Sequence, residues 1–93
     1  MKGTKYDKEK PRWTLLPFRE LEQVVDVLTS GAQKYDDDNW KKVVSDDKDR
    51  YFSACMRHLV AWRQDELVDK ESKKPHLAHA VCCILFLMWN DNG

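Results

Sequence analysis

Apolar residues recur at helical spacing in three stretches of the chain. The first stretch starts at Pro17, which suits the first turn of a helix, and its apolar positions are Phe18, Leu21, Val25, Leu28 and Ala32. Residues 29–31 weaken this helix, which is expected to end at Gly31 or to continue towards Tyr35. The pattern predicts one amphipathic helix near the N-terminus.

A second helix is expected after residues 45–47, a serine and two aspartates, because these residue types favour helix N-caps. Its apolar face is predicted to carry Phe52, Cys55, Met56, Leu59, Trp62 and Leu67. Residues 34–44 contain three successive aspartates and an asparagine, so we predict a loop there. Residues 1–16 lack an apolar period, and Pro11 disfavours helix at Lys10, so they are predicted to form an extended arm.

The third helix is predicted to open at Pro75 and is apolar on almost every side across residues 77–89. Two other helices of the same chain cannot cover such a helix all round, whereas a partner chain can. We therefore predict an all-α fold for residues 1–93, in which a single domain of an N-terminal helix and a helical hairpin forms an oligomeric helical bundle. Oligomerisation would also help a chain this short, whose monomer buries only about 60–65% of its unfolded surface.

The composition argues against several classes of partner. Sixteen Lys and Arg residues balance sixteen Asp and Glu residues, so net charge draws no nucleic acid to the chain. The N-terminal sequence lacks an apolar signal segment, and the apolar run at residues 80–89 is about half of a membrane span. The three cysteines show no C-x-x-C pair and are expected to be reduced core thiols. A cytoplasmic protein without a membrane partner is expected.

All three histidines lie within residues 58–79, close to several carboxylates: His58, His76 and His79 with Asp65, Glu66, Asp69 and Glu71. Imidazole suits zinc, iron, nickel or manganese, and Asp65, Asp69 or Glu71 could complete a metal shell. The histidines could equally contact an anion or a base, or be structural. No HExxH motif decides between these alternatives.

Cationic and aromatic side chains supply the groups that a phosphorylated purine needs. The candidates for phosphate are Arg12, Lys34, Arg57 and Arg63, since guanidinium offers a bidentate fork and Lys a point charge. Trp13, Tyr35 and Trp40 could stack on a base, a contact worth about 1–3 kcal/mol. Trp62 is expected in the core, and the aspartates of residues 36–38 are expected to form a solvated turn rather than a cation site.

Four segments together resemble a known family. They are residues 10–17 (KPRWTLLP), residues 31–35 (GAQKY) with Asn39 and Trp40, residues 57–62 (RHLVAW), and residues 69–72 (DKES) with residues 76–80 (HLAHA). In this order they resemble the phage-borne N-terminal domain of dATP/dGTP diphosphohydrolases. The resemblance implies purine deoxynucleoside triphosphates, a divalent metal and release of pyrophosphate, in the manner of small all-α pyrophosphohydrolases of the MazG kind. It also implies the cytoplasm of an infected bacterial host.

The sequence departs from the MazG pattern in its acidic residues. Those enzymes hold Mg²⁺ with EExxE on one helix and ExxD on the next, because Mg²⁺ prefers several oxygen ligands. Here the corresponding helices carry Arg57, His58 and Trp62, then His76 and His79. Asp36 also follows Tyr35 where the family commonly has glycine.

Two functions therefore remain open, besides a purely structural helical oligomer. In the first, the protein sequesters a nucleotide-like ligand at a subunit interface, without cofactor or hydrolysis; the ligand-binding candidates are Arg12, Trp13, Lys34, Tyr35, Asn39, Trp40, Arg57, His58, His76 and His79. In the second, it is a pyrophosphohydrolase of dATP or dGTP. A divalent metal would then be held by His58, His76 and His79 with Asp69 or Glu71, and Glu20 or Glu22 would be the base. The residues do not distinguish a deoxynucleoside triphosphate from a cyclic dinucleotide or an ADP-ribose-type ligand.

Overall fold

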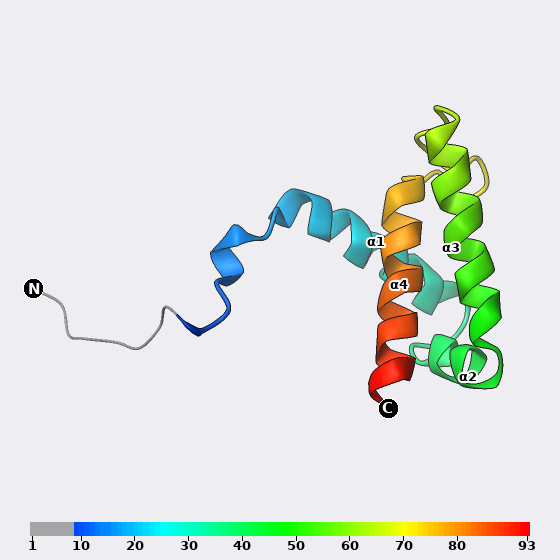
Figure 1. Cartoon of the computed structure of the whole chain (residues 1–93). Coiled ribbons are helices and arrows are strands. Elements are labelled where there is room, and N and C mark those ends of the chain that lie inside the picture. Colours follow the sequence, from blue (N-terminus) through cyan, green and yellow to red (C-terminus); the bar gives the residue numbers. More distant parts are fainter. Residues whose placement is uncertain (1–8) are drawn as a thin grey trace, which may run out of the picture.

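The computed structural model describes residues 9–93, and within that range the regular secondary structure is entirely helical (Figure 1). The elements are η2 (Trp13–Leu15), a 3-10 turn, and the α-helices α1 (Phe18–Lys34), α2 (Asn39–Asp46), α3 (Lys48–Arg63) and α4 (His76–Asn92). The all-α fold class is confirmed. Across these residues no helix combines the length and the hydropathy that crossing a membrane requires.

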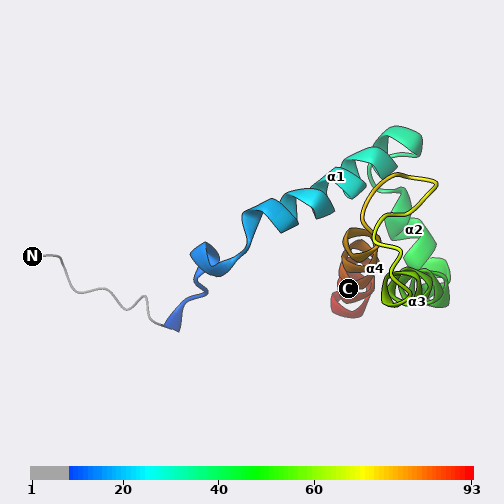
Figure 2. The same ribbon diagram turned by 90° about the horizontal axis from the view of Figure 1, so that it is seen from above.

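The body of the molecule is a hairpin of α3 and α4, which run side by side in opposite directions (Figure 1). The C-terminal half of α1 crosses one face of this hairpin, and α2 packs against α3 and α4 next to it (Figure 2). The N-terminal half of α1 and η2 project away from the body. Of the predicted extended arm, residues 1–8 lie outside the described residues, and the remainder contains the 3-10 turn and is largely exposed.

The core consists of two small clusters on either side of α4. Towards α1, Val24 packs on Ala78 and Cys82, and the Cys82 thiol donates to the Val24 carbonyl oxygen at 3.5 Å. Towards α3, Cys55 packs on Ala80 and Cys83. Alanines and cysteines at these contacts let the helices approach closely. All three cysteines are free and buried, as expected for core thiols.

The predicted apolar face of α1 is only partly correct. Val24 is the buried residue of this helix, with Val27 and Leu28 packed around it, while Phe18 and Val25 remain 59% and 50% exposed. The physical reason is that α1 touches the body with its C-terminal half alone. The sequence period identifies a helix, whereas the crossing point with α4 selects which side chains are buried.

The prediction of a loop at residues 34–44 is wrong over its second half, where α2 begins at Asn39. Trp40, Val43 and Val44 form an inward stripe on α2, and Val44 is only 1% exposed. The aspartates at residues 36–38 stay outside the helix, and burial of this stripe stabilises the helix that follows them. The expected N-cap of α3 is confirmed, since the Asp47 carboxylate accepts from the Asp49 backbone N–H at 3.2 Å.

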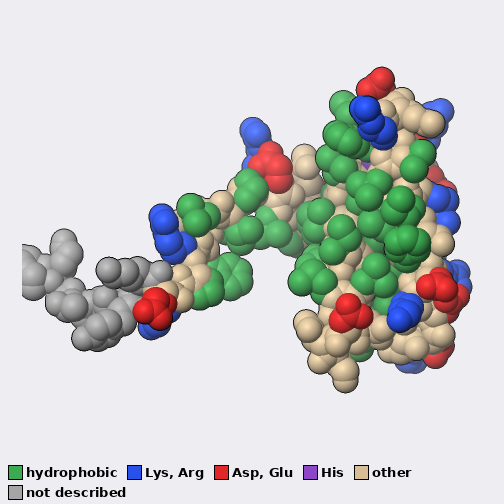
Figure 3. Space-filling model, in the orientation of Figure 1, with side chains coloured by type: hydrophobic (Ala, Val, Ile, Leu, Met, Phe, Trp, Pro, Cys, Tyr) green, Lys and Arg blue, Asp and Glu red, His purple; other side chains and the backbone are tan. Residues whose placement is uncertain are grey.

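Helices α3 and α4 bury fewer apolar side chains than their sequences predict. Phe52, Met56 and Trp62 of the predicted α3 face are 56%, 43% and 39% exposed. On α4, the sides towards α1, α2 and α3 are covered, and large apolar side chains remain on the outer surface of the hairpin (Figure 3). Residues 9–93 form four α-helices rather than the three predicted, and the oligomeric bundle stays a prediction.

Candidate ligand-binding site

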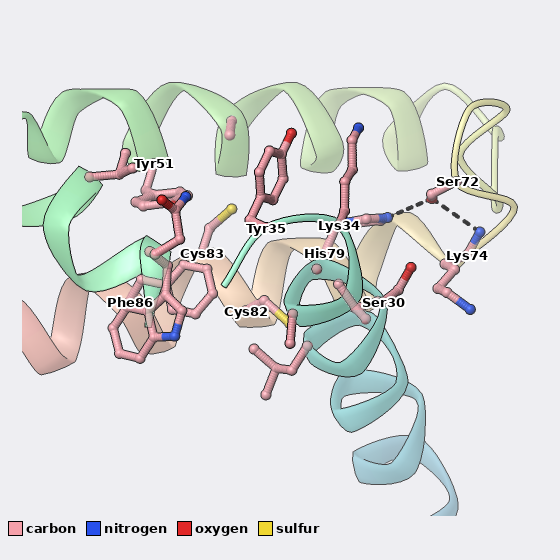
Figure 4. A pocket seen from close by; sticks show the side chains of 18 of the residues that line it. Ser30, Lys34, Tyr35, Tyr51, Ser72, Lys74, His79, Cys82, Cys83 and Phe86 are labelled. Atoms are coloured by element: carbon pink, nitrogen blue, oxygen red, sulfur yellow. Dashed lines mark hydrogen bonds between the residues drawn. The ribbon is translucent and has the colours of Figure 1, made fainter. Parts of the chain in front are cut away.

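A pocket of about 1140 Å³ lies between the C-terminal part of α1, α2, α3, α4 and the loop of residues 64–75. The predicted location of the site at a subunit interface stays a prediction. Figure 4 places Tyr51 and Phe86 at one end of the pocket and His79, Ser72 and Lys74 at the other. The pocket therefore has an aromatic end and a polar end, which is the arrangement that a purine carrying phosphates requires.

The loop of residues 64–75 positions the polar end. A β-bridge joins Val68 to Pro75, and Lys73 closes the turn with a φ of 64°. Inside the turn, the Ser72 backbone N–H donates to Asp69 Oδ2 at 2.9 Å, and the Lys74 backbone N–H donates to Ser72 Oγ at 3.2 Å. These bonds hold the Ser72 hydroxyl 2.7 Å from His79 Nε2.

The three histidines meet at this end of the pocket. The rings of His58 and His79 stack in parallel, with centroids 4.5 Å apart, and His58 Nδ1 lies 2.8 Å from His76 Nδ1. His76 is only 4% exposed, and its Nε2 lies 2.6 Å from Glu66 Oε2. One continuous chain of contacts thus joins Glu66, His76, His58, His79 and Ser72.

Glu66 determines the orientation of protons in this chain. A carboxylate only accepts hydrogen bonds, so His76 Nε2 carries a proton and donates it to Glu66. When His76 is neutral, its Nδ1 accepts, and His58 must donate from Nδ1–H. His58 Nε2 is then a bare acceptor, and His58 lines the pocket.

Burial keeps two of the three imidazoles uncharged near neutral pH. Burial, with His79 and His76 adjacent, lowers the pKa of His58 to about 4, and Asp69 only partly opposes this shift. Burial also lowers the pKa of His79, again against Asp69. These imidazoles are therefore hydrogen-bonding groups rather than cations, and the charge of a phosphate must be met by other side chains.

Fixed cations at the pocket come from several elements: Lys34 of α1, Arg50 and Arg57 of α3, and Lys74 of the loop. Lys74 Nζ is bound to Asp26 Oδ2 at 2.9 Å, so part of its charge is compensated. Arg57 adjoins His58 in sequence, and both residues line the pocket. Lys34, Arg50 and Arg57 are the other cationic residues of the lining.

The aromatic end is partly built into the core. The Trp40 ring stacks on Phe86 with centroids 4.4 Å apart, and the edge of Trp89 meets it at 5.1 Å. One face of Trp40 is therefore already occupied. Tyr35 is 59% exposed at the pocket, and Lys34 Nζ lies 5.4 Å from its ring centroid. Tyr35 is thus better placed than Trp40 to stack on a base.

Most of the sequence-predicted site residues line this pocket; they are Lys34, Tyr35, Asn39, Trp40, Arg57, His58, Asp69, Glu71, His76 and His79. Arg12 and Trp13 do not, because they lie on the exposed segment before α1. Glu20 and Glu22, the candidate bases, are exposed on the projecting half of α1. Asp65 and Arg63 are also outside the lining.

The structure adds residues that the sequence analysis did not select: Arg50, Tyr51, Glu66, Ser72 and Lys74. Ser72 lies within the DKES segment that carries the family resemblance, and Glu66 lies in the acidic stretch between the histidines. Their sequence positions were therefore visible, but their contacts depend on the fold of the loop. Arg50 and Tyr51 carried no such signal.

A metal site is not formed by the side chains as placed. Within residues 9–93, no group of three or more His, Cys, Asp or Glu side chains could hold a metal ion. Both ring nitrogens of His76 are engaged, by Glu66 and by His58, and His79 Nε2 is engaged by Ser72. No metal-dependent step is therefore assigned to these residues, and the divalent metal of the hydrolytic alternative stays a prediction.

Comparison with known proteins adds a family to this geometry. The sequence model of the family described as dATP/dGTP diphosphohydrolase, N-terminal, matches residues 1–93. A dATP/dGTP diphosphohydrolase of Salmonella phage PMBT28 is 33% identical over 93 residues, which cover 100% of this chain and 31% of that relative. The chain thus spans about a third of the relative's length. A search of solved structures gives no match.

Proposed function

Since the chain belongs to the family of dATP/dGTP diphosphohydrolase N-terminal domains, we propose that its pocket binds a purine deoxynucleoside triphosphate such as dATP or dGTP. One observation carries the proposal: a single pocket of about 1140 Å³ joins an aromatic end to a polar end with fixed cations. Ligand pockets of small molecules are commonly about 300–1000 Å³, so this volume suffices for a nucleotide.

The triphosphate is assigned to Arg57 and Lys34. A guanidinium donates two parallel hydrogen bonds to phosphate oxygens, and charge-assisted bonds of this kind are about twice as strong as neutral ones. Neutral His58 is not expected to bind phosphate, because its unprotonated Nε2 and a phosphate oxygen are both hydrogen-bond acceptors. It suits a hydroxyl of the deoxyribose or an N–H of the base, each of which can donate to that nitrogen.

The purine is assigned to the aromatic end. Tyr35 offers an exposed ring face, and Tyr51 and Phe86 extend the apolar wall behind it, with their centroids 4.9 Å apart. A purine has a larger ring face than a pyrimidine and stacks over more of this surface. Selectivity for dATP and dGTP over dCTP is therefore expected.

A second candidate is hydrolysis of the bound triphosphate by this chain itself, which the name of the Salmonella phage relative favours. In the first candidate the chain holds the nucleotide intact, as sequestration requires. The same pocket and contacts serve both candidates, so the fate of the nucleotide distinguishes them.

The test is calorimetric titration of the purified protein with dATP, dGTP and dCTP. Arg57→Gln is expected to weaken purine binding by about 10- to 100-fold, since a hydrogen bond to a charged group contributes about 1.5–3 kcal/mol. Arg19→Gln is the matched control, because Arg19 is exposed on α1, outside the pocket lining, and pairs with Glu20. Equal affinity for all three nucleotides, or no effect of Arg57→Gln, would contradict the proposal.

Chromatography of the nucleotide after incubation with Mg²⁺, Mn²⁺ or Zn²⁺ then separates the two candidates. Intact dATP recovered after heat denaturation supports binding without turnover. Accumulating monophosphate and pyrophosphate support hydrolysis, provided that Arg57→Gln slows their release and Arg19→Gln does not.

A further inference from the structure

The outer side of α4 is an uncovered apolar stripe. Leu77, Val81, Ile84 and Met88 follow one another at intervals of four, three and four residues, and they are 39–53% exposed. Ala78 and Ala80, which flank the stripe, are buried against α1 and α3. The intervals match the a/d spacing by which one helix packs along another.

A second stripe lies next to it on α3, where Phe52, Met56 and Val60 are 43–56% exposed. Met56 directly follows the core residue Cys55, and Ile84 directly follows the core residue Cys83. Successive residues of a helix point about 100° apart, so each stripe is rotated by that angle, in the same sense, from the contact between α3 and α4. Because α3 and α4 are antiparallel, the two stripes emerge on the same face. Figure 3 shows the hydrophobic side chains gathered over these two helices. We call this surface, formed by the seven residues, the apolar face.

The apolar face is directed away from the pocket. The residues that precede the core contacts by one position, Ala54 and His79, turn the other way and line the pocket. A partner on the apolar face therefore leaves the nucleotide site open.

The α3 stripe is complementary to itself when reversed. It begins at Asp49 and ends at Arg63, about 21 Å apart along the helix, and among residues 9–93 neither side chain has an ionic partner. When a second α3 lies antiparallel, Asp49 faces Arg63 of the second copy and Phe52 faces its Val60. Met56 then faces its own equivalent.

We propose that the apolar face binds a second copy of this chain about a two-fold axis that runs across the helices, so that α3 packs on α3 and α4 on α4. Seven half-exposed apolar side chains supply most of the stabilisation, and the Asp49–Arg63 pairs at both ends set the orientation. Such a pairing is isologous and closes at two copies. It gives the expected oligomeric bundle a defined surface, and it does not depend on which ligand the pocket takes.

The first measurement is sedimentation of the full chain over micromolar to millimolar concentrations. The protein is expected to be a dimer, and Ile84→Glu is expected to be a folded monomer with unchanged helical circular dichroism. Val25→Glu places the same charge at an exposed apolar position of α1 and should leave the dimer intact. A wild-type chain that stays monomeric would overturn the proposal, as would a dimer that persists in Ile84→Glu. Burial of the apolar face by another part of a longer chain would overturn it as well.

The second measurement tests the orientation. Asp49→Arg alone and Arg63→Asp alone are each expected to weaken the dimer, and the double exchange is expected to restore it. Met56→Cys should form an oxidised, disulfide-linked dimer, whereas Phe52→Cys should not, because Phe52 faces Val60. Cross-linking of Phe52→Cys but not of Met56→Cys would exclude this axis. Nucleotide titration of Ile84→Glu shows whether the pocket proposal holds when the interface is lost.

Discussion

The two faces of the α3–α4 hairpin depart from the usual relation between polarity and exposure in opposite ways. On the pocket face, α1, α2 and the loop of residues 64–75 cover polar groups, including a histidine that is 4% exposed. On the apolar face, seven large apolar side chains remain open to solvent. Solvent alone would favour the reverse distribution. The two proposals give each face an occupant: a nucleotide in the pocket on one side and a second copy of the chain on the other.

The same two helices supply both faces because adjacent residues point about 100° apart. His79 and Val81 flank Ala80 on α4 and diverge to opposite sides of the hairpin. A change on one face can therefore be made without altering the other. This separation makes the comparison testable by single substitutions.

The largest expected effect is loss of the aromatic wall of the pocket face. Phe86 packs on the Val24 cluster and contacts both Trp40 and Tyr51, so Phe86→Ala is expected to lower the free energy of unfolding by about 3–5 kcal/mol. Met88→Ala, two residues later on the apolar face, is the matched control. Made in the Ile84→Glu background, it should lower the free energy of unfolding by much less than Phe86→Ala does. Urea denaturation measures both, and equal losses would show that the two faces are packed alike.

Acid is expected to weaken the pocket face next. The unfolded chain protonates His58 near its ordinary pKa of 6.5, whereas the folded chain does so at about 4, so the unfolded state binds more protons between these values. Stability then rises with pH across this window and is lost as the pH falls through it. The groups that face His58 are His79, His76, Asp69 and Arg57.

Melting temperatures measured between pH 7 and pH 4 test this expectation. His58→Phe keeps a flat ring against His79 and should flatten the pH dependence between about 6.5 and 4. If the melting temperature of this variant depends on pH as that of the wild type does, groups other than His58 cause the acid sensitivity. Glu66 and Asp69 also make the protein less stable as the pH falls, but at lower pH. The hydrogen bond with His76 lowers the pKa of Glu66. Burial would raise the pKa of Asp69, but the bonds from Ser72 hold it below its ordinary value.

The smallest expected effect concerns the hydroxyl that fixes the loop. Ser72→Ala removes the contact with His79 Nε2 and the bond from the Lys74 backbone N–H, and a loss of about 1 kcal/mol of stability is expected. Ser53→Ala, at an exposed position of α3, should be neutral within about 0.5 kcal/mol. Chemical denaturation of both variants compares them, and a neutral Ser72→Ala would mean that the turn is held by Asp69 and the β-bridge alone.

Much of the site was predictable as a set of residues but not as an arrangement. The histidines, Arg57, Lys34 and Tyr35 were selected for their chemistry, and the structure brings all of them to one pocket. Arg12 and Trp13 were selected for the same chemistry but lie elsewhere. Chemical type does not encode which segments approach one another, because that depends on where α1 crosses the hairpin.

The amino-acid sequence alone determined the helices with strong apolar period, the N-cap at Asp47, the buried thiols and the excess of apolar surface on α4. These features are local, or they follow from composition, so no contact between distant segments is needed to infer them. Tertiary structure alone decided that α2 is a helix, that Val24 rather than Val25 is buried, and that Glu66 and Ser72 orient the histidines. Each of these outcomes depends on burial against a segment distant in sequence, and burial free energy outweighs local propensity wherever the two disagree.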